Sequence, residues 1–144
     1  MADDKEKKSI GQQPGIPSSK GEGFSWKARG RSFVYAFRGI RKLISEEHNA
    51  RIHTAAAILA IAAGIWLRIS ATEWAIVAIC IGSVLAAEAI NSAVEALANK
   101  VNPEYDPLIG KAKDFASAAV LLTAIAAAIA GLIIFLPPII VRLT

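Results

Sequence analysis

Three long apolar segments constrain this chain more than any other feature of its sequence. They cover about residues 49–69, 72–97 and 115–141 and consist mainly of Ala, Ile, Leu and Val. Each is at least as long as the roughly 20 residues that a helix needs to cross the hydrocarbon core of a bilayer. At 54% hydrophobic residues, the chain is too apolar for an ordinary soluble domain of this size. The sequence therefore predicts an all-α membrane protein with three transmembrane helices.

The distribution of basic residues predicts how these helices cross the membrane. Eleven of the 16 Lys and Arg residues lie within residues 1–51. A loop is expected between Asn99 and Lys113, because this stretch contains prolines, a glycine and further lysines. Positive charge accumulates on the cytoplasmic side of membrane proteins. We therefore expect the basic head and this loop to be cytoplasmic and the C-terminus to lie outside.

The head of the chain divides into two parts ahead of the first crossing. Residues 1–24 are polar and aperiodic and are expected to be a disordered tail, which leaves 25–144 as one membrane domain. Residues 26–46 show a basic amphipathic helical pattern, suited to lying on the cytoplasmic surface of the bilayer. Packing of this helix on a protein partner is the alternative. Nucleic acid is not an expected partner, because the basic residues alternate with aromatic and aliphatic ones. The apolar stripe of this helix consists of Phe33, Phe37, Ile40 and Ile44.

Polar groups inside the second apolar segment are the main indication of function. Glu88, Asn91 and Glu95 fall on one face of the predicted helix at about 100° per residue. A charged carboxylate in a bilayer costs about 2.5 kcal/mol or more, so such groups are retained mainly for use. Three helices alone offer these side chains little shelter. We therefore expect a homo-oligomer that packs around this polar face.

Further carboxylates are expected near the cytoplasmic ends of the helices. Glu47, Glu95 and Asp114 could gather there, and Lys113 is adjacent. Carboxylates beside a cationic side chain suit Mg²⁺ bound to nucleotide phosphates. Glu88 lies deeper, where a buried carboxylate can act as a general base on a lipid hydroxyl. The alternatives are that Glu47 is simply solvated and that Lys113 and Asp114 are an ordinary helix start.

Two stretches of the sequence carry a family signature, and three shorter ones fit the same order. The two are Glu88-Ala-Ile-Asn91-Ser-Ala-Val-Glu95 and Gly110-Lys-Ala-Lys113-Asp114-Phe-Ala-Ser117-Ala-Ala-Val. The three are Phe37-Arg38-Gly39, Glu47 with Arg51, and Glu104-Tyr105. Together they resemble the prokaryotic diacylglycerol kinase family, which includes undecaprenol kinases. The resemblance covers roughly residues 28–137.

The resemblance implies a homotrimeric helical bundle in the bacterial cytoplasmic (inner) membrane. Such a protein phosphorylates a lipid hydroxyl with ATP and Mg²⁺, at cytoplasmic active sites shared between subunits. By position, Glu88 matches the catalytic base, and Glu47 and Glu95 match the carboxylates that hold the metal. Asn91 matches a residue that positions groups beside the base. The nucleotide-contacting positions are matched by Tyr35, Glu104, Asp106, Lys113 and Asp114. Positions near the lipid are matched by Arg51 and Ser117.

Three positions depart from the pattern that the resemblance implies. Asn99 stands where aspartate is common, and Asp106 stands where histidine is frequent. His53 stands where diacylglycerol kinases carry glutamate and undecaprenol kinases often carry histidine. His53 thus favours undecaprenol, whereas the run from Ser117 to Val120 favours diacylglycerol. We take diacylglycerol as the expected acceptor and undecaprenol as the alternative.

Two readings from other classes of protein stay open. The chain could be a small oligomeric subunit that conducts protons or ions, with Glu88 as its intramembrane carboxylate. That reading accounts for Glu88 but not for Lys113, Asp114 or the basic surface helix. The chain could also be a scaffold in which Glu88 and Asn91 only join helices. Apart from the resemblance, His53 is expected to be an interfacial polar residue at a helix start.

Overall fold

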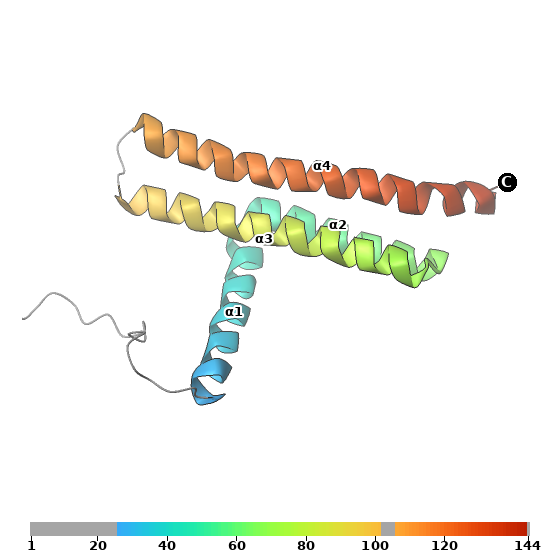
Figure 1. Cartoon of the computed structure of the whole chain (residues 1–144), viewed down its shortest axis with the longest axis horizontal. Helices are drawn as coiled ribbons and strands as arrows, with labels where there is room; N and C mark the ends of the chain where they lie inside the picture. Colours follow the sequence, from blue (N-terminus) through green and yellow to red (C-terminus); the bar gives the residue numbers. More distant parts are fainter. Residues whose placement is uncertain (1–25, 102–105, 144) are drawn as a thin grey trace, which may run out of the picture. The chain divides into compact units, whose positions relative to one another are not determined.

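The computed structural model describes residues 26–101 and 106–143, and every element within them is an α-helix. Figure 1 shows these helices in order along the chain. They are α1 (Trp26–Glu46), α2 (His48–Leu67), α3 (Ala71–Val101) and α4 (Pro107–Leu143). α2, α3 and α4 are each long and apolar enough to cross a membrane. The prediction of an all-α protein with three membrane-spanning helices is confirmed, whereas the predicted tail, 1–24, lies outside the described residues.

The chain divides after Val34 into two units. The first unit contains the opening turns of α1, and the second contains the rest of α1 and the three apolar helices. The helix predicted over 26–46 is present with those bounds. Phe37 and Ile40, from its predicted apolar stripe, are largely exposed. An exposed apolar stripe agrees with a helix that lies on a bilayer surface, which stays a prediction.

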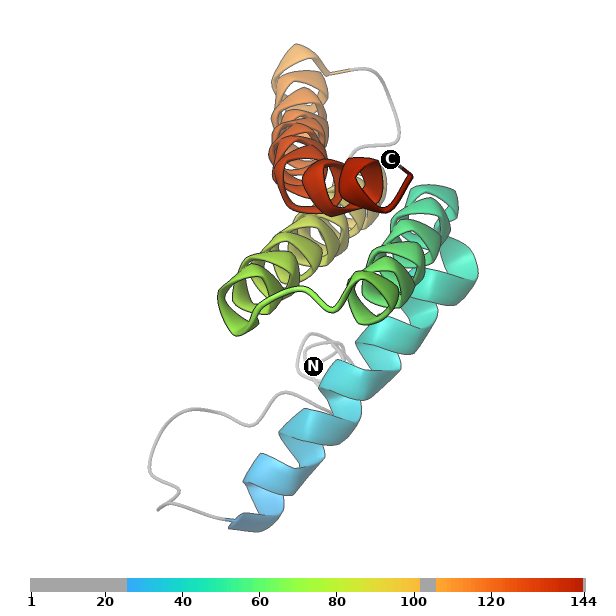
Figure 2. The same cartoon turned by 90° about the vertical axis from the view of Figure 1, so that its right-hand side faces the viewer.

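α2, α3 and α4 pack against one another, with α3 antiparallel to both of the others, and α3 and α4 share the most extensive contact. Seen end-on, the three helices form a triangle (Figure 2). Few apolar side chains of these helices are buried: Ala50 and Leu67 of α2, Val77 and Val84 of α3 and Ile134 of α4. Most large apolar side chains of these helices point outward instead. That is the arrangement expected of helices surrounded by lipid or by further subunits.

A tight turn joins α2 to α3 at the end of the bundle remote from the α3–α4 connection. Arg68 ends α2 in the left-handed conformation, with φ 56° and ψ 49°. Its N–H donates to the Ile65 carbonyl at 3.3 Å, and the next N–H, of Ile69, donates to the Gly64 carbonyl at 3.2 Å. This is a Schellman motif. Gly64 is buried, and the ring of Trp74 lies only 2.9 Å from the position that a Cβ would take.

A capping box starts α3. Ser70 Oγ accepts a hydrogen bond from the Glu73 N–H at 3.3 Å. In return, Glu73 Oε2 accepts one from the Ser70 N–H at 2.7 Å. Each side chain thereby satisfies a backbone donor that the first turn of a helix leaves without a partner. α3 therefore begins at Ala71, one residue before the predicted start of the second crossing.

Both predicted bounds of the loop from 99 to 113 are wrong, because α3 continues to Val101 and α4 already begins at Pro107. Asp106 explains the early start of α4. Its Oδ1 accepts hydrogen bonds from the N–H groups of Leu108 at 2.7 Å and Ile109 at 3.1 Å. Pro107 occupies the first helical position, where its missing N–H is harmless. A proline and a glycine that were read as loop signals thus belong to a capped first turn.

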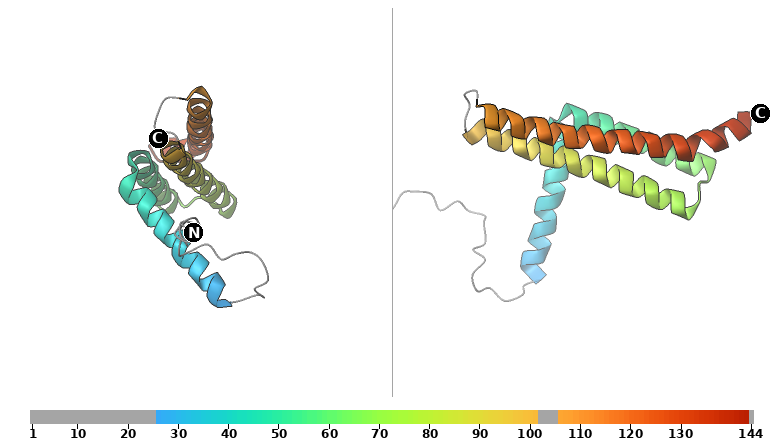
Figure 3. Two further views of the ribbon diagram at one scale, coloured as in Figure 1. Left: turned by 90° about the vertical axis from the view of Figure 1, so that its left-hand side faces the viewer. Right: turned by 45° about the horizontal axis from the view of Figure 1, so that its top comes forward.

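α4 ends two residues beyond residue 141, the predicted end of the third crossing. Pro137 and Pro138 lie inside the helix, which runs on to Leu143. Two consecutive prolines remove two backbone donors from the helical ladder, and such a loss bends a helix. α4 bends over its last turns, as Figure 3 shows. Membrane helices tolerate prolines where local adjustments satisfy the freed carbonyls.

Candidate active site

Glu88 and Asn91 are the two buried polar side chains among the described residues. Glu88 is 2% exposed and Asn91 is 8% exposed, and both project from the inner face of α3. Their spacing of three residues places them almost one above the other on a helix. A carboxylate buried to this extent must be stabilised by neighbouring groups, because an uncompensated charge in an apolar interior is very costly. The side chains that surround Glu88 and Asn91 come from α2, α3 and α4.

α2 supplies the group nearest to Glu88. His53 Nε2 lies 3.3 Å from Glu88 Oε1, and the imidazole is three-quarters buried. The two atoms are close, yet their geometry is not that of a hydrogen bond, and Glu88 Oε1 has no hydrogen-bond partner among the described residues. Sequence reasoning treated His53 as an interfacial residue and missed this contact. No spacing rule connects two residues so far apart on different helices.

Asn91 links α3 to α4 and to the next carboxylate along α3. Its Nδ2 donates a hydrogen bond to Glu95 Oε1 at 3.0 Å. Its Oδ1 accepts one from Ser117 Oγ of α4 at 3.4 Å. Because the amide has a partner on each side, its orientation is fixed. The structure therefore brings together three residues that the sequence assigned to one site, Asn91, Glu95 and Ser117.

Glu47 approaches the same region from the junction of α1 and α2. It occupies the N-cap position of α2 in an extended conformation, but its side chain makes no capping hydrogen bond. The carboxylate is thus left free of the usual N-cap role. Glu47 and Glu95 are both close enough to Glu88 to repel its charge. Two carboxylates of α3 and one from the junction of α1 and α2 therefore influence one another electrostatically.

The carboxylates around Glu88 can be compared with the ligands that Mg²⁺ usually takes. Within the described ranges, no three acidic, His or Cys side chains are close enough to form a metal cage. Mg²⁺ seldom needs one, since it usually takes one or two protein carboxylates together with water and substrate phosphates. Glu47 and Glu95 are two carboxylates that each lie within electrostatic range of Glu88, and Asn91 orients that of Glu95. The donor set fits Mg²⁺ bound to a nucleotide.

At the α3–α4 connection, Lys113 Nζ donates to Asn99 Oδ1 at 3.4 Å. This contact holds the ammonium of α4 beside the end of α3, and it involves the position where aspartate was expected. Asp114 is exposed. Asp106, expected to contact the nucleotide, uses one carboxylate oxygen to cap α4. Glu104, assigned to the same role, lies outside the described residues.

Two other predicted site residues are surface residues here. The ring of Tyr35 lies under the guanidinium of Arg38, 5.7 Å from its centroid, and is exposed. Arg51 is also exposed, and its Nε donates to the Glu47 carbonyl at 3.4 Å. Arg51 is thus tied to the backbone of a candidate metal ligand. Among the described residues, Tyr35 has no contact of this kind with a candidate metal ligand or with Glu88.

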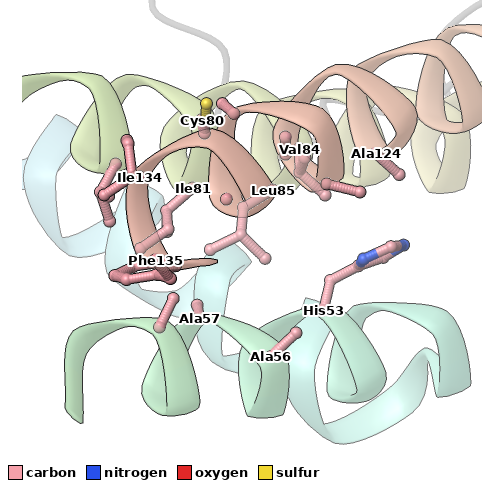
Figure 4. Close-up of a pocket in the computed structure, with 16 residues that line it drawn as sticks. His53, Ala56, Ala57, Cys80, Ile81, Val84, Leu85, Ala124, Ile134 and Phe135 are labelled. Atoms are coloured by element: carbon pink, nitrogen blue, oxygen red, sulfur yellow. The ribbon is translucent and has the colours of Figure 1, made fainter. Parts of the chain in front are cut away.

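A cavity of about 320 Å³ lies between α2, α3 and α4. Its walls are almost entirely alanine, aliphatic and aromatic side chains, among them Ala57, Leu85 and Phe135. His53 lines one end, with its nitrogens directed away from the apolar side chains (Figure 4). Since Glu88 lies beside those nitrogens, the cavity and the buried carboxylate meet at this imidazole.

The sequence matches known proteins over most of its length. The sequence model of the prokaryotic diacylglycerol kinase family matches residues 34–135. The chain is 37% identical to a protein of Bacillus subtilis named undecaprenol kinase, over 74% of this chain and 87% of that protein. It is 38% identical to a diacylglycerol kinase of Synechocystis sp., over 74% of this chain and 62% of that protein. It is 35% identical to the diacylglycerol kinase of Escherichia coli K12, over 66% of this chain and 78% of that protein.

Proposed function

The chain belongs to the prokaryotic diacylglycerol kinase family of lipid kinases, and on that premise we propose that it transfers the γ-phosphate of ATP to the hydroxyl of diacylglycerol. The observation that carries this proposal is the burial of Glu88 beside Asn91 on α3. In this proposal the buried carboxylate meets a lipid hydroxyl, and the nucleotide phosphates approach from the side of Glu95 and Lys113. The roles of individual residues follow from their positions.

In this mechanism Glu88 is the general base. Its carboxylate takes the proton of the lipid hydroxyl as the hydroxyl oxygen attacks the γ-phosphorus in line. Phosphoryl transfer requires mainly positioning and charge stabilisation, so a small helical frame is sufficient. Lys113 offsets negative charge on the phosphates, and its hydrogen bond to Asn99 keeps the ammonium beside the C-terminal end of α3.

The nucleotide phosphates are expected to lie between Glu47, Glu95 and Lys113. Mg²⁺, when bound with ATP, would be held by Glu47 and Glu95 and would neutralise charge on the phosphate oxygens. Asn91 holds the Glu95 carboxylate in place through its 3.0 Å hydrogen bond. Tyr35, Asp106, Asp114 and Glu104 are proposed to contact the nucleotide at the edge of the site. Arg51 and Ser117 are proposed to lie near the lipid.

Undecaprenol is the second candidate acceptor, and one specific observation favours it. The Bacillus subtilis relative named undecaprenol kinase matches 87% of its own length to this chain, more than either diacylglycerol kinase described above. Both candidates present a primary hydroxyl at the membrane interface, so the chemistry at Glu88 is the same. We keep diacylglycerol as the first proposal and let the acceptor be decided by assay.

We further propose that three copies of the chain assemble in the bacterial inner membrane with the site on the cytoplasmic side. The outward-facing apolar side chains of α2, α3 and α4 provide surface for such packing. The lysines at the α3–α4 connection, Lys100, Lys111 and Lys113, favour a cytoplasmic position for the end that carries the site. Sedimentation of the detergent-solubilised protein would test the number of chains.

The experiment that tests the function is transfer of labelled phosphate from ATP by the detergent-purified protein. Diacylglycerol and undecaprenol are offered separately, each with Mg²⁺ present or chelated. We expect labelling of diacylglycerol that depends on Mg²⁺ and is lost in the Glu88→Gln variant. Labelling of undecaprenol alone would mean that the acceptor is undecaprenol and that the protein is still a lipid kinase.

A failure to label either lipid would overturn the proposal, provided that the protein is folded and oligomeric. Liposomes containing the protein would then be tested for proton or ion flux without nucleotide. Flux that disappears in Glu88→Gln would establish the alternative of a conducting subunit. If Glu88→Gln changed only the stability of the oligomer, the remaining interpretation would be a scaffold in which Glu88 only joins helices.

A further inference from the structure

We propose that His53 is a positioning residue for phosphoryl transfer, and that its imidazole holds Oε1 of Glu88 so that the other carboxylate oxygen meets the lipid hydroxyl. This inference rests on the lipid kinase activity proposed above. It goes beyond the roles that the family resemblance implies, because that resemblance gives His53 no part in orienting the carboxylate of Glu88.

The first observation is the distance. His53 Nε2 and Glu88 Oε1 are 3.3 Å apart, slightly beyond the usual range for a hydrogen bond between nitrogen and oxygen. An imidazole that carries its proton on Nε2 can donate it to a carboxylate, and a small rotation of the ring would align the pair. Hydrogen bonds of catalytic groups are often loose before substrate binds and tighten in the complex.

The second observation is that Oε1 has no other partner. Glu88 is 2% exposed, and its Oε1 is buried without a hydrogen bond to any described group. Asn91, the nearest amide along α3, is already occupied by Glu95 and Ser117. Glu47 and Glu95 carry the same charge as Glu88 and can only repel it. Of the side chains described around this oxygen, His53 is the one able to donate a proton to it.

The third observation is that water is a poor substitute for this donor. On the other side of the imidazole lies the cavity lined by Ala56, Ala57 and Leu85. A water molecule needs two to four polar partners to be retained in a protein interior, and an apolar cavity does not provide them. Loss of the imidazole would therefore leave the carboxylate free to turn. A base that can turn away from the acceptor lowers the rate of transfer without weakening ATP binding.

Three substitutions of His53 distinguish the loss of a hydrogen-bond donor from the loss of side-chain packing. Glutamine places an amide nitrogen at about the reach of Nε2, methionine has the same length without a donor, and asparagine carries a donor one bond too short. His53→Met should lower kcat about ten- to a hundredfold, the size of one hydrogen bond to a charged group, with the KM for ATP unchanged. His53→Asn should behave like His53→Met. His53→Gln should stay within a few-fold of the unsubstituted protein.

His48 provides the matched control, since it lies on the same helix and is exposed. His48→Met should leave kcat unchanged. The inference is overturned if His53→Met keeps its kcat, or if His53→Gln loses as much as His53→Met, because either result removes the need for a donor. Should His53→Met fail to fold, the comparison of glutamine with asparagine decides the same question. An inactive unsubstituted protein would instead overturn the proposed function, so the two failures are distinct.

Discussion

Replacing Gly64 with alanine should destabilise the packing of α2 against α3. The added Cβ would lie 2.9 Å from two ring carbons of Trp74 and 3.0 Å from Ile69 Cδ1. Carbon atoms in good contact are about 3.5–4.0 Å apart, so the indole or the helix would have to move. Forcing one extra carbon into a packed site costs about 1–3 kcal/mol.

Gly82→Ala, on α3, is the matched control for this substitution. No described atom lies within 4 Å of the position that a Cβ on Gly82 would take. Both substitutions gain the same helix propensity, about 1 kcal/mol for alanine over glycine. That gain cancels when the two variants are compared. The free energy of unfolding of Gly64→Ala should therefore be about 1–3 kcal/mol lower than that of Gly82→Ala.

The measurement is a titration of the purified protein from mild into denaturing detergent, followed by circular dichroism. Equal stability of the two variants would refute the reasoning, because it would mean that Trp74 does not fill the space over Gly64. A Trp74→Leu background provides a further check, since the penalty of Gly64→Ala should largely disappear there. The kcat should be the same in all these variants, because Gly64 lies in the last turn of α2, beside the tight turn into α3.

Four further predictions concern the site and the helix ends. Glu88→Gln should lower kcat for lipid phosphorylation about 10²–10⁴-fold with an unchanged circular dichroism spectrum; a variant that kept most of its turnover would rule out the base role. Glu95→Gln should raise the Mg²⁺ concentration needed for half-maximal activity, and an unshifted Mg²⁺ titration would argue against a metal ligand. Asp106→Ala should lower the free energy of unfolding by about 0.5–2 kcal/mol through loss of the α4 cap, whereas Asp106→Asn should change it little in the same detergent titration. Arg68→Gly should raise that free energy by up to about 1 kcal/mol, because relief of the left-handed conformation is partly offset by the entropy that glycine loses on folding.

Features that depend on local pattern could be predicted from the sequence. The length of the apolar segments predicted three membrane-spanning helices, and these are present. Helical periodicity placed Glu88, Asn91 and Glu95 on one face of a helix. In the structure Glu88 and Asn91 are buried, and Asn91 is hydrogen-bonded to Glu95. Such inferences succeed because an α-helix fixes the directions of its own side chains.

Features that depend on packing between helices, or on competition at helix ends, could not be predicted in the same way. The contact between His53 and Glu88 depends on how α2 settles against α3, and no spacing in the chain encodes that distance. The start of α4 was misplaced because proline and glycine act as breakers in one context and as first-turn residues in another. Asp106 decides between the two by capping the helix.

The lengths of the helices have a consequence for the membrane itself. α2, with 20 residues, spans about 30 Å and so just matches the hydrocarbon core. α3, with 31 residues, is about 46 Å long, so it must project beyond that core. If Ala71 is at one boundary, the other falls about 20 residues along, near Ile90. Glu88 then lies only about 3 Å inside the hydrocarbon, and a bilayer thinner by a few ångströms would lift it among the headgroups. Bilayer thickness thus sets which part of a lipid is level with this carboxylate.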